Sequence, residues 1–177
     1  ITSNSLAYAL SNGLNGIAVS SGTAPAGAVV YTQNFSNNKI TLTTTGVAIV
    51  YGIDFGHGTA NATMTGSNNN ISITQTSGAA NSAAINGIRA SYTSGTKTFD
   101  TDTLTVTQSN SAGATSGLVI GINAGTNAGT TVNATNSIIT FKQSVSGAGT
   151  MTGTMTYIDV SASSATVNVT GNILNTT

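Results

Sequence analysis

The sequence is 177 residues long, with a mass of 17.5 kDa, and only eight side chains carry a formal charge, four basic and four acidic. A net charge of zero gives no attraction to nucleic-acid phosphates or anionic lipids, so nucleic-acid binding is excluded from the expected functions. No run of about 18 apolar residues is present, so no membrane-spanning segment is expected, and the absence of cysteine leaves no disulfide framework.

The polar composition points to a secreted location. Thr, Ser and Asn number 33, 21 and 20, while Glu is absent. A surface of hydroxyl and amide groups with few charges is typical of extracellular and cell-surface proteins, so we expect this localisation. The sequence begins at Ile1 rather than Met, which fits a processed precursor and equally a fragment boundary.

The N-terminal segment, residues 1–39, is apolar at its start. Leu6, Tyr8 and Leu10 alternate with small residues, a spacing that suits a strand and a short helix over residues 5–11 equally well. We interpret the segment as a loosely fitting first coil. Its first strand is a candidate for exchange with a neighbouring copy.

From residue 40 to residue 172 the sequence repeats with a period of about 34 residues. The first strand of the repeat is seen in ISITQ from Ile71, LTVTQ from Leu104 and ITFKQ from Ile139. Residues 173–177 form a C-terminal tail that opens a further unit. An apolar residue begins each unit, 31 to 35 residues after the previous one, at Ile40, Ile71, Leu104, Ile139 and Ile173. A second motif keeps the same period, at Gly16, Gly52, Gly87, Gly121 and Tyr157.

Short strands with period-two alternation, joined by Gly, Asn, Ser and Thr clusters, predict an all-β fold. We expect a single domain, residues 1–177, folded as a parallel β-helix (β-solenoid) of about five coils. Stacking then aligns Gln75, Gln108 and Gln143 in an amide ladder, and it places Asp54 beside Arg89 on the outside of neighbouring coils. The alternative is a pilin-like β-sandwich that donates its N-terminal strand to a neighbour.

Residues suited to catalysis are few. His57 is the single histidine, and Asp54, three residues earlier, would lie on the opposite face of a strand, so a Ser–His–Asp triad is not supported. Asp100 and Asp102 could pair at a strand end, as in calcium sites and glycosidases, but a solvated turn is favoured. We therefore expect no catalytic residue, no cofactor and no metal site, and we do not expect an enzyme.

The outward positions of the first strand are rich in threonine. They are Thr41 and Thr43, Ser72 and Thr74, Thr105 and Thr107, and Thr140 and Lys142. Such an array is similar to the ice-binding face of some antifreeze proteins, although threonine is also a common outward residue in strands. Ice or ligand binding by this array is therefore kept as an alternative.

Asn-x-Ser/Thr sequons occur about as often as this composition gives by chance. They permit glycosylation without indicating it, so glycans are one class of partner. The six asparagines are Asn34, Asn61, Asn70, Asn133, Asn168 and Asn175.

The repeat in residues 40–172, an apolar-x-apolar-Thr-Gln strand followed by a Gly-Ile strand, resembles the β-strand repeats of bacterial autotransporter passengers and large surface adhesins. The resemblance implies a surface location and an adhesive or structural role, and it transfers no site residues. No translocator follows within the sequence up to Thr177, which fits either a passenger fragment or a secreted subunit.

A parallel solenoid has an unpaired strand edge at each end, and head-to-tail contact between such edges gives a filament. We therefore expect a structural subunit of an extracellular filament or surface assembly, which binds copies of itself as a homopolymer. The alternatives are an adhesin or passenger stalk fragment and the ice- or ligand-binding solenoid. Candidate assembly residues are Ile1, Leu6, Leu10, Ile173 and Leu174.

Overall fold

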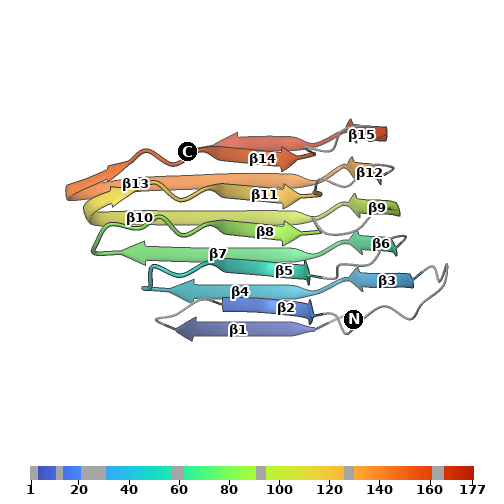
Figure 1. The fold of residues 1–177 in the computed structure, drawn as a ribbon, viewed down its shortest axis with the longest axis horizontal. Helices are drawn as coiled ribbons and strands as arrows, with labels where there is room; N and C mark the ends of the chain where they lie inside the picture. The colour runs from blue at the N-terminus through green and yellow to red at the C-terminus, as the bar shows by residue number, and fades with distance from the viewer. Residues whose placement is uncertain are drawn as a thin grey trace.

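The computed structural model describes residues 4–10, 14–20, 31–56, 62–90, 95–125, 130–160 and 166–177. Within these ranges the chain forms strands only, and the strands pair in parallel to build three sheets. Figure 1 shows the strands stacked in layers from β1 at the bottom to β15 at the top, with the two termini at opposite ends of the stack. The predicted all-β parallel solenoid is therefore confirmed, and the antiparallel β-sandwich is wrong.

Each of the first five layers takes one strand from each sheet, and the last strand of the first sheet begins a sixth layer. The first sheet consists of β1 (Ser5–Leu10), β4 (Lys39–Thr44), β7 (Asn70–Ser77), β10 (Thr103–Thr115), β13 (Ile138–Met151) and β16 (Ile173–Thr176). The second consists of β2 (Leu14–Ser20), β5 (Val50–Gly56), β8 (Ile85–Arg89), β11 (Val119–Asn123) and β14 (Met155–Asp159). The third consists of β3 (Tyr31–Ser36), β6 (Ala62–Ser67), β9 (Gly95–Asp100), β12 (Thr130–Thr135) and β15 (Thr166–Thr170).

Side-chain alternation directs one face of each strand into the stack. In β7 the inward residues Ile71 and Ile73 are buried, whereas the outward residues Ser72 and Thr74 are half-buried. The register stacks Ile71 between Ile40 and Leu104, so each inward position becomes an apolar column along the axis. Burial of these columns is the main favourable term for a chain with so few charges.

The second sheet has a glycine at the same position in several layers. A Cβ atom at Gly52 would clash with the carbonyl oxygen of Gly87 and the side chain of Ile71, and Gly87 and Gly121 are in the same situation. The backbones of neighbouring layers therefore approach closely at these positions. This close approach lets two consecutive residues, the glycine and the following isoleucine, both face the interior.

The turn from the third sheet to the first repeats the same two-residue geometry in every layer. Its first residue has a positive φ, at Asn37 (58°), Asn68 (54°), Thr101 (56°), Asn136 (52°) and Gly171 (67°). Asn and Gly tolerate this conformation best. The second residue of each turn points inward and begins the interior ladder described below.

One predicted register is wrong. Ile139 pairs with Leu174, and Ile173 pairs with Ile138, so Leu174 rather than Ile173 occupies the inward position that begins the unit. The two-residue turn at Gly171 and Asn172 sets this phase. Because Ile173 and Leu174 are both apolar, hydrophobicity alone does not distinguish them.

Candidate functional site

The C-terminal end of the solenoid exposes residues that are core residues in the other layers. Val167 and Val169 continue the inward columns of Val132 and Ala134, which are fully buried, yet they are 48% and 43% exposed. Leu174 continues the column of Ile139 and is 46% exposed, and its neighbour Ile173 is 54% exposed. Two of the expected assembly residues, Ile173 and Leu174, are therefore exposed on the last strand of the stack, Leu174 at an inward position and Ile173 at an outward one.

This end surface is also hollowed. An open depression of about 550 Å³ lies between β14, β15 and β16. Tyr157 lines the depression, and its ring stacks in parallel on the buried ring of Phe141 with centroids 4.7 Å apart. The Tyr157 hydroxyl is hydrogen-bonded to the hydroxyl of Thr176. The lining residues are Met155, Thr156, Tyr157, Ile158, Val160, Val167, Val169 and Leu174.

The N-terminal end is formed by β1, β2 and β3. Leu6 is partly buried against the core, and Ile17 is 6% exposed. β1 pairs in parallel with β4 of the same chain, so its position in this structure is within its own stack. Of the other assembly residues, Ile1 lies outside the described residues, and Leu10 lies in β1 with its side chain outside the description.

A column of hydrogen-bonded side chains runs along the interior at the turn that enters the first sheet. The backbone N–H of each member donates to the side-chain oxygen of the member in the next layer, as from Asn38 to Asn69 (3.1 Å) and from Asn69 to Asp102 (2.9 Å). We call it the turn ladder. Its members are Asn4, Asn38, Asn69, Asp102, Ser137 and Asn172.

Sequence reasoning missed the turn ladder. Its residue type changes from layer to layer, so no repeated letter marks it. The available signal is a polar residue two positions before each unit-opening apolar residue, preceded by Asn, Thr or Gly. By contrast, the predicted glutamine ladder is confirmed: Gln108 donates to Gln75 (2.9 Å) and Gln143 donates to Gln108 (2.9 Å).

Two charged side chains are fully buried. Lys97 donates to the carbonyl oxygens of Ala90 (2.5 Å) and Ala124 (2.6 Å), and burial lowers its pKa to about 8. Asp102 accepts both Asn69 donors at Oδ1, while its Oδ2 has no partner. Burial is the main cause that raises the Asp102 pKa to about 6. Both groups serve the packing of the stack and face its interior.

The expectation that Asp100 and Asp102 both lie in a solvated turn is wrong for Asp102. Asp100 faces outward and accepts from Thr135 (2.6 Å) and Asn136 (3.0 Å), and these hydrogen bonds lower its pKa. Asp102 faces inward because the turn residue before it has a positive φ. The two carboxylates therefore bind different partners, and no group of three or more His, Cys, Asp or Glu residues in the described ranges is placed to hold a metal. His57 lies outside those ranges.

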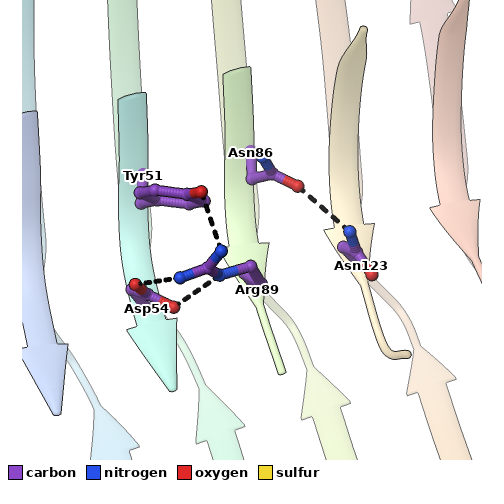
Figure 2. Close-up of polar contacts among 5 residues, drawn as sticks. All are labelled: Tyr51, Asp54, Asn86, Arg89 and Asn123. Atoms are coloured by element: carbon purple, nitrogen blue, oxygen red, sulfur yellow. Dashed lines mark hydrogen bonds and ion pairs between the residues drawn. The ribbon is translucent and has the colours of Figure 1, made fainter. Parts of the chain in front are cut away.

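The outer face of the second sheet carries the predicted Asp54–Arg89 pair, which is confirmed (Figure 2). Arg89 donates from Nε to Asp54 Oδ1 (2.7 Å) and from Nη2 to Asp54 Oδ2 (2.5 Å). Its Nη1 donates to the Tyr51 hydroxyl (2.7 Å), and the guanidinium lies 3.9 Å from the centroid of the Tyr51 ring. Figure 2 also shows Asn123 donating to Asn86 on the neighbouring strands (3.2 Å). These contacts link adjacent layers. Within them, the charge of Arg89 is paired with that of Asp54.

The threonine columns predicted on the first sheet have the expected register. Thr41, Ser72, Thr105 and Thr140 form one column, and Thr43, Thr74, Thr107 and Lys142 form the next. The third sheet has a comparable outer column that sequence reasoning did not single out. In it, Thr32 pairs with Thr63, and Thr131 pairs with Thr96 on one side and with Thr166 on the other.

Five of the six sequon asparagines lie on outer faces. Asn34, Asn70, Asn168 and Asn175 are exposed, and Asn133 is half-buried beside Asn168 in the next layer. Asn61 lies outside the described residues. Glycosylation at these positions stays a prediction.

Comparisons with protein-family models, with curated proteins and with solved structures find no significant match to this chain. No helix occurs among the described residues, and hence none is long and apolar enough to cross a membrane.

Proposed function

We propose that the protein is a structural subunit of an extracellular filament or surface assembly, in which copies associate end to end. The observation that carries the proposal is the C-terminal end surface, where Val167, Val169, Ile173 and Leu174 are exposed beside unpaired strand edges. Apolar surface next to an open strand edge favours addition of another chain.

The polarity of the stack determines the kind of assembly. In the described part of the chain, β1, β2 and β3 each pair on one side only, as do β14, β15 and β16 at the other end. The two ends present different surfaces, so contact between them is heterologous. A heterologous contact that does not close into a ring propagates as a filament. The near absence of charge supports this, because little electrostatic repulsion opposes the approach of copies.

The experiment is electron microscopy and sedimentation velocity of the purified protein over a range of concentrations. We expect linear particles that lengthen with concentration in the wild type. Leu174→Lys, which places a charge on the end surface, should shorten them. Leu118→Lys is the matched control, because Leu118 is 47% exposed on the body of the stack and Leu174 is 46% exposed at its end. Single particles at every concentration would contradict the proposal.

An adhesin or passenger stalk is the alternative, in which further coils of the same polypeptide would cover the end surface. It predicts rods of constant length that do not respond to Leu174→Lys. Location outside the cell and glycan attachment belong to the same proposal. The Thr-, Ser- and Asn-rich composition supports the location, and the exposed sequons leave glycan attachment sterically possible.

A second candidate function is ice or ligand binding by the threonine columns of the first sheet, favoured by their regular register. Thermal hysteresis of the purified protein tests it. Thr74→Tyr and Thr107→Tyr should abolish the effect, because a large ring would interrupt the column without entering the core. Absence of thermal hysteresis in the wild type would reject ice binding.

A further inference from the structure

The three sheets do not end at the same level of the stack. The first sheet contains six strands, whereas the second and third contain five each, so β16 extends one layer beyond β14 and β15. If a second copy placed its β1 on β16, its β2 and β3 would lie one strand spacing too far from β14 and β15. Continuation of all three sheets therefore requires that β16 of one copy and β1 of the next compete for a single place.

β16 and β1 are equivalent in register. Leu6 of β1 and Leu174 of β16 are the two ends of the same inward apolar column, which runs through every layer of the first sheet. Asn4 and Asn172, two residues before these leucines, are the first and last members of the turn ladder. The two strands thus present an asparagine and a leucine in the same phase, so β16 can make the contacts that β1 makes with β4.

These contacts with β4 are specific at the turn ladder. Within one chain the backbone N–H of Asn4 donates to Asn38 Oδ1 (3.2 Å), and the N–H of Lys39 donates to the carbonyl oxygen of Asn4 (2.7 Å). With β16 in the place of β1, Asn172 would make both hydrogen bonds to a second copy. Leu174, which is 46% exposed in the single chain, would be covered within the apolar column.

The same placement covers the exposed valines of β15. Phe35 of β3 belongs to the inward column that ends at Val169, and Gln33 belongs to the one that ends at Val167. β3 of a second copy would therefore extend the third sheet and bring its Phe35 over Val169. This burial is additional to that of the single chain, whereas the β1–β4 pairing is only exchanged for a β16–β4 pairing.

Tyr157 favours β16 over β1 as the strand that keeps the shared place. Its ring stacks on Phe141 and its hydroxyl is hydrogen-bonded to Thr176, so the ring lies beside a small residue of β16. β1 has Tyr8 at the register position of Thr176, and a second tyrosine there would compete with Tyr157 for the same space. Tyr157 also stands where the inner layers have glycine, so β2 of the second copy must shift away from β14 at this one position.

We propose that copies join by strand exchange: β16 of one copy displaces β1 of the next copy and pairs with its β4. This inference rests on the proposed function, because it specifies how the end-to-end contact is made. The displaced β1 gives up its six paired residues, and the β16–β4, β14–β2 and β15–β3 pairings replace them.

The first experiment traps the junction with cysteines, because the sequence contains none. Ser5 pairs with Lys39 on the outer face, and Ile173 holds the position of Ser5 in β16. Lys39→Cys combined with Ile173→Cys should give disulfide-linked oligomers in non-reducing electrophoresis, because strand exchange makes the two positions neighbours. Within one chain β7, β10 and β13 separate them. The control, Ser5→Cys with Ile173→Cys, should not link, since that pair is adjacent only if β1 stacks on β16.

The second experiment uses matched substitutions whose effects should have opposite signs. Leu174→Lys puts a charge into the strand that enters the junction, so it should weaken association at least about tenfold. Leu6, which is partly buried against its own core, lies in the strand that leaves. Leu6→Lys should therefore strengthen association by a similar factor. Sedimentation velocity measures both variants, and thermal unfolding checks that both retain the fold.

The outcomes separate the two proposals. Wild-type filaments combined with linkage of the Ser5–Ile173 pair, with linkage of neither pair, or with weaker association of Leu6→Lys overturn strand exchange and leave the filament function standing. A monomeric wild type beside an assembling Leu6→Lys variant supports strand exchange and contradicts the filament function. Monomers in every variant contradict both.

Discussion

The two polar ladders inside the stack differ in whether each side chain can both donate and accept a hydrogen bond. In the glutamine ladder each side chain has a donor and an acceptor, and the same group repeats at Gln75, Gln108 and Gln143 with both hydrogen bonds at 2.9 Å. In the turn ladder the members change from Asn to Asp to Ser. At Asp102 the side chain has only acceptors when it is ionised, and Oδ2 is left without a partner.

The difference shows what each position requires. The turn ladder needs an oxygen toward the preceding layer, which Asp102 supplies to Asn69. It also benefits from a donor on the other side-chain atom: Asn69 Nδ2 donates to the carbonyl oxygen of Phe35 (2.8 Å), and Asn172 Nδ2 donates to that of Ala134 (2.7 Å). By the register of the third sheet, the equivalent acceptor for residue 102 is the carbonyl oxygen of Gly66. Asparagine satisfies both requirements, and ionised aspartate satisfies one.

Asp102→Asn should therefore have the largest effect, a stabilisation of about 3 kcal/mol at pH 7. This value follows from the pKa of Asp102, which is 3.8 ordinarily and about 6 in the folded protein. The folded state holds the Asp102 proton up to about pH 6, whereas the unfolded state releases it near 3.8. The wild type thus loses stability as the pH rises through this window, and the loss is complete above it. Urea unfolding of both proteins from pH 3 to pH 8 measures the difference.

The pH profile distinguishes this cause from a general packing effect. The two proteins should have nearly equal unfolding free energies at the acidic end of the series, and they should diverge between about pH 4 and pH 6. Asp100 and Lys97 also titrate, but they are present in both proteins, so the difference between the curves isolates Asp102. A stabilisation that is the same at every pH would refute the assignment.

Breaking the glutamine ladder should have the next largest effect. Gln108→Leu removes the acceptor of Gln143 and the donor to Gln75, and it should cost about 2 kcal/mol because buried polar groups lose their partners. The matched variant replaces all three glutamines by leucine, leaving no unpaired amide among them, so it should be less destabilised than the single variant. Chemical denaturation measures both. A triple variant less stable than the single one would mean that packing, rather than hydrogen bonding, governs this column.

These ladders also show how far the sequence predicts the structure. The glutamine ladder, the Asp54–Arg89 pair and the glycine column were predicted because a letter, or a pair of opposite charges, recurs at one offset in the repeat. The turn ladder was missed because Asn38, Asp102 and Ser137 share only an inward side-chain oxygen, which a list of residue types does not reveal. The phase of Ile173 and Leu174 was also wrong, because two adjacent apolar residues fit either register and the turn at Gly171 decides between them.

The smallest expected effect concerns the turn residue beside the imperfect ladder position. Thr101 adopts a φ of 56°, where a β-branched side chain is strained, whereas Asn37, Asn68 and Asn136 occupy the equivalent position in other layers. Its hydroxyl donates to Asn68 Oδ1 (2.7 Å), but the contact is exposed and contributes little. Thr101→Asn should therefore stabilise the protein by about 1 kcal/mol, which thermal unfolding would register as a higher Tm.

Asn37→Thr provides the reciprocal change two layers away, in the same backbone conformation. It should lower the stability by about the amount that Thr101→Asn gains, because the strain is a property of the turn rather than of its neighbours. If both substitutions left the Tm unchanged, the positive φ would not limit the residue type at this turn. The stabilising effect of asparagine at these two-residue turns would then come entirely from the second turn residue. The Asp102→Asn substitution measures that contribution.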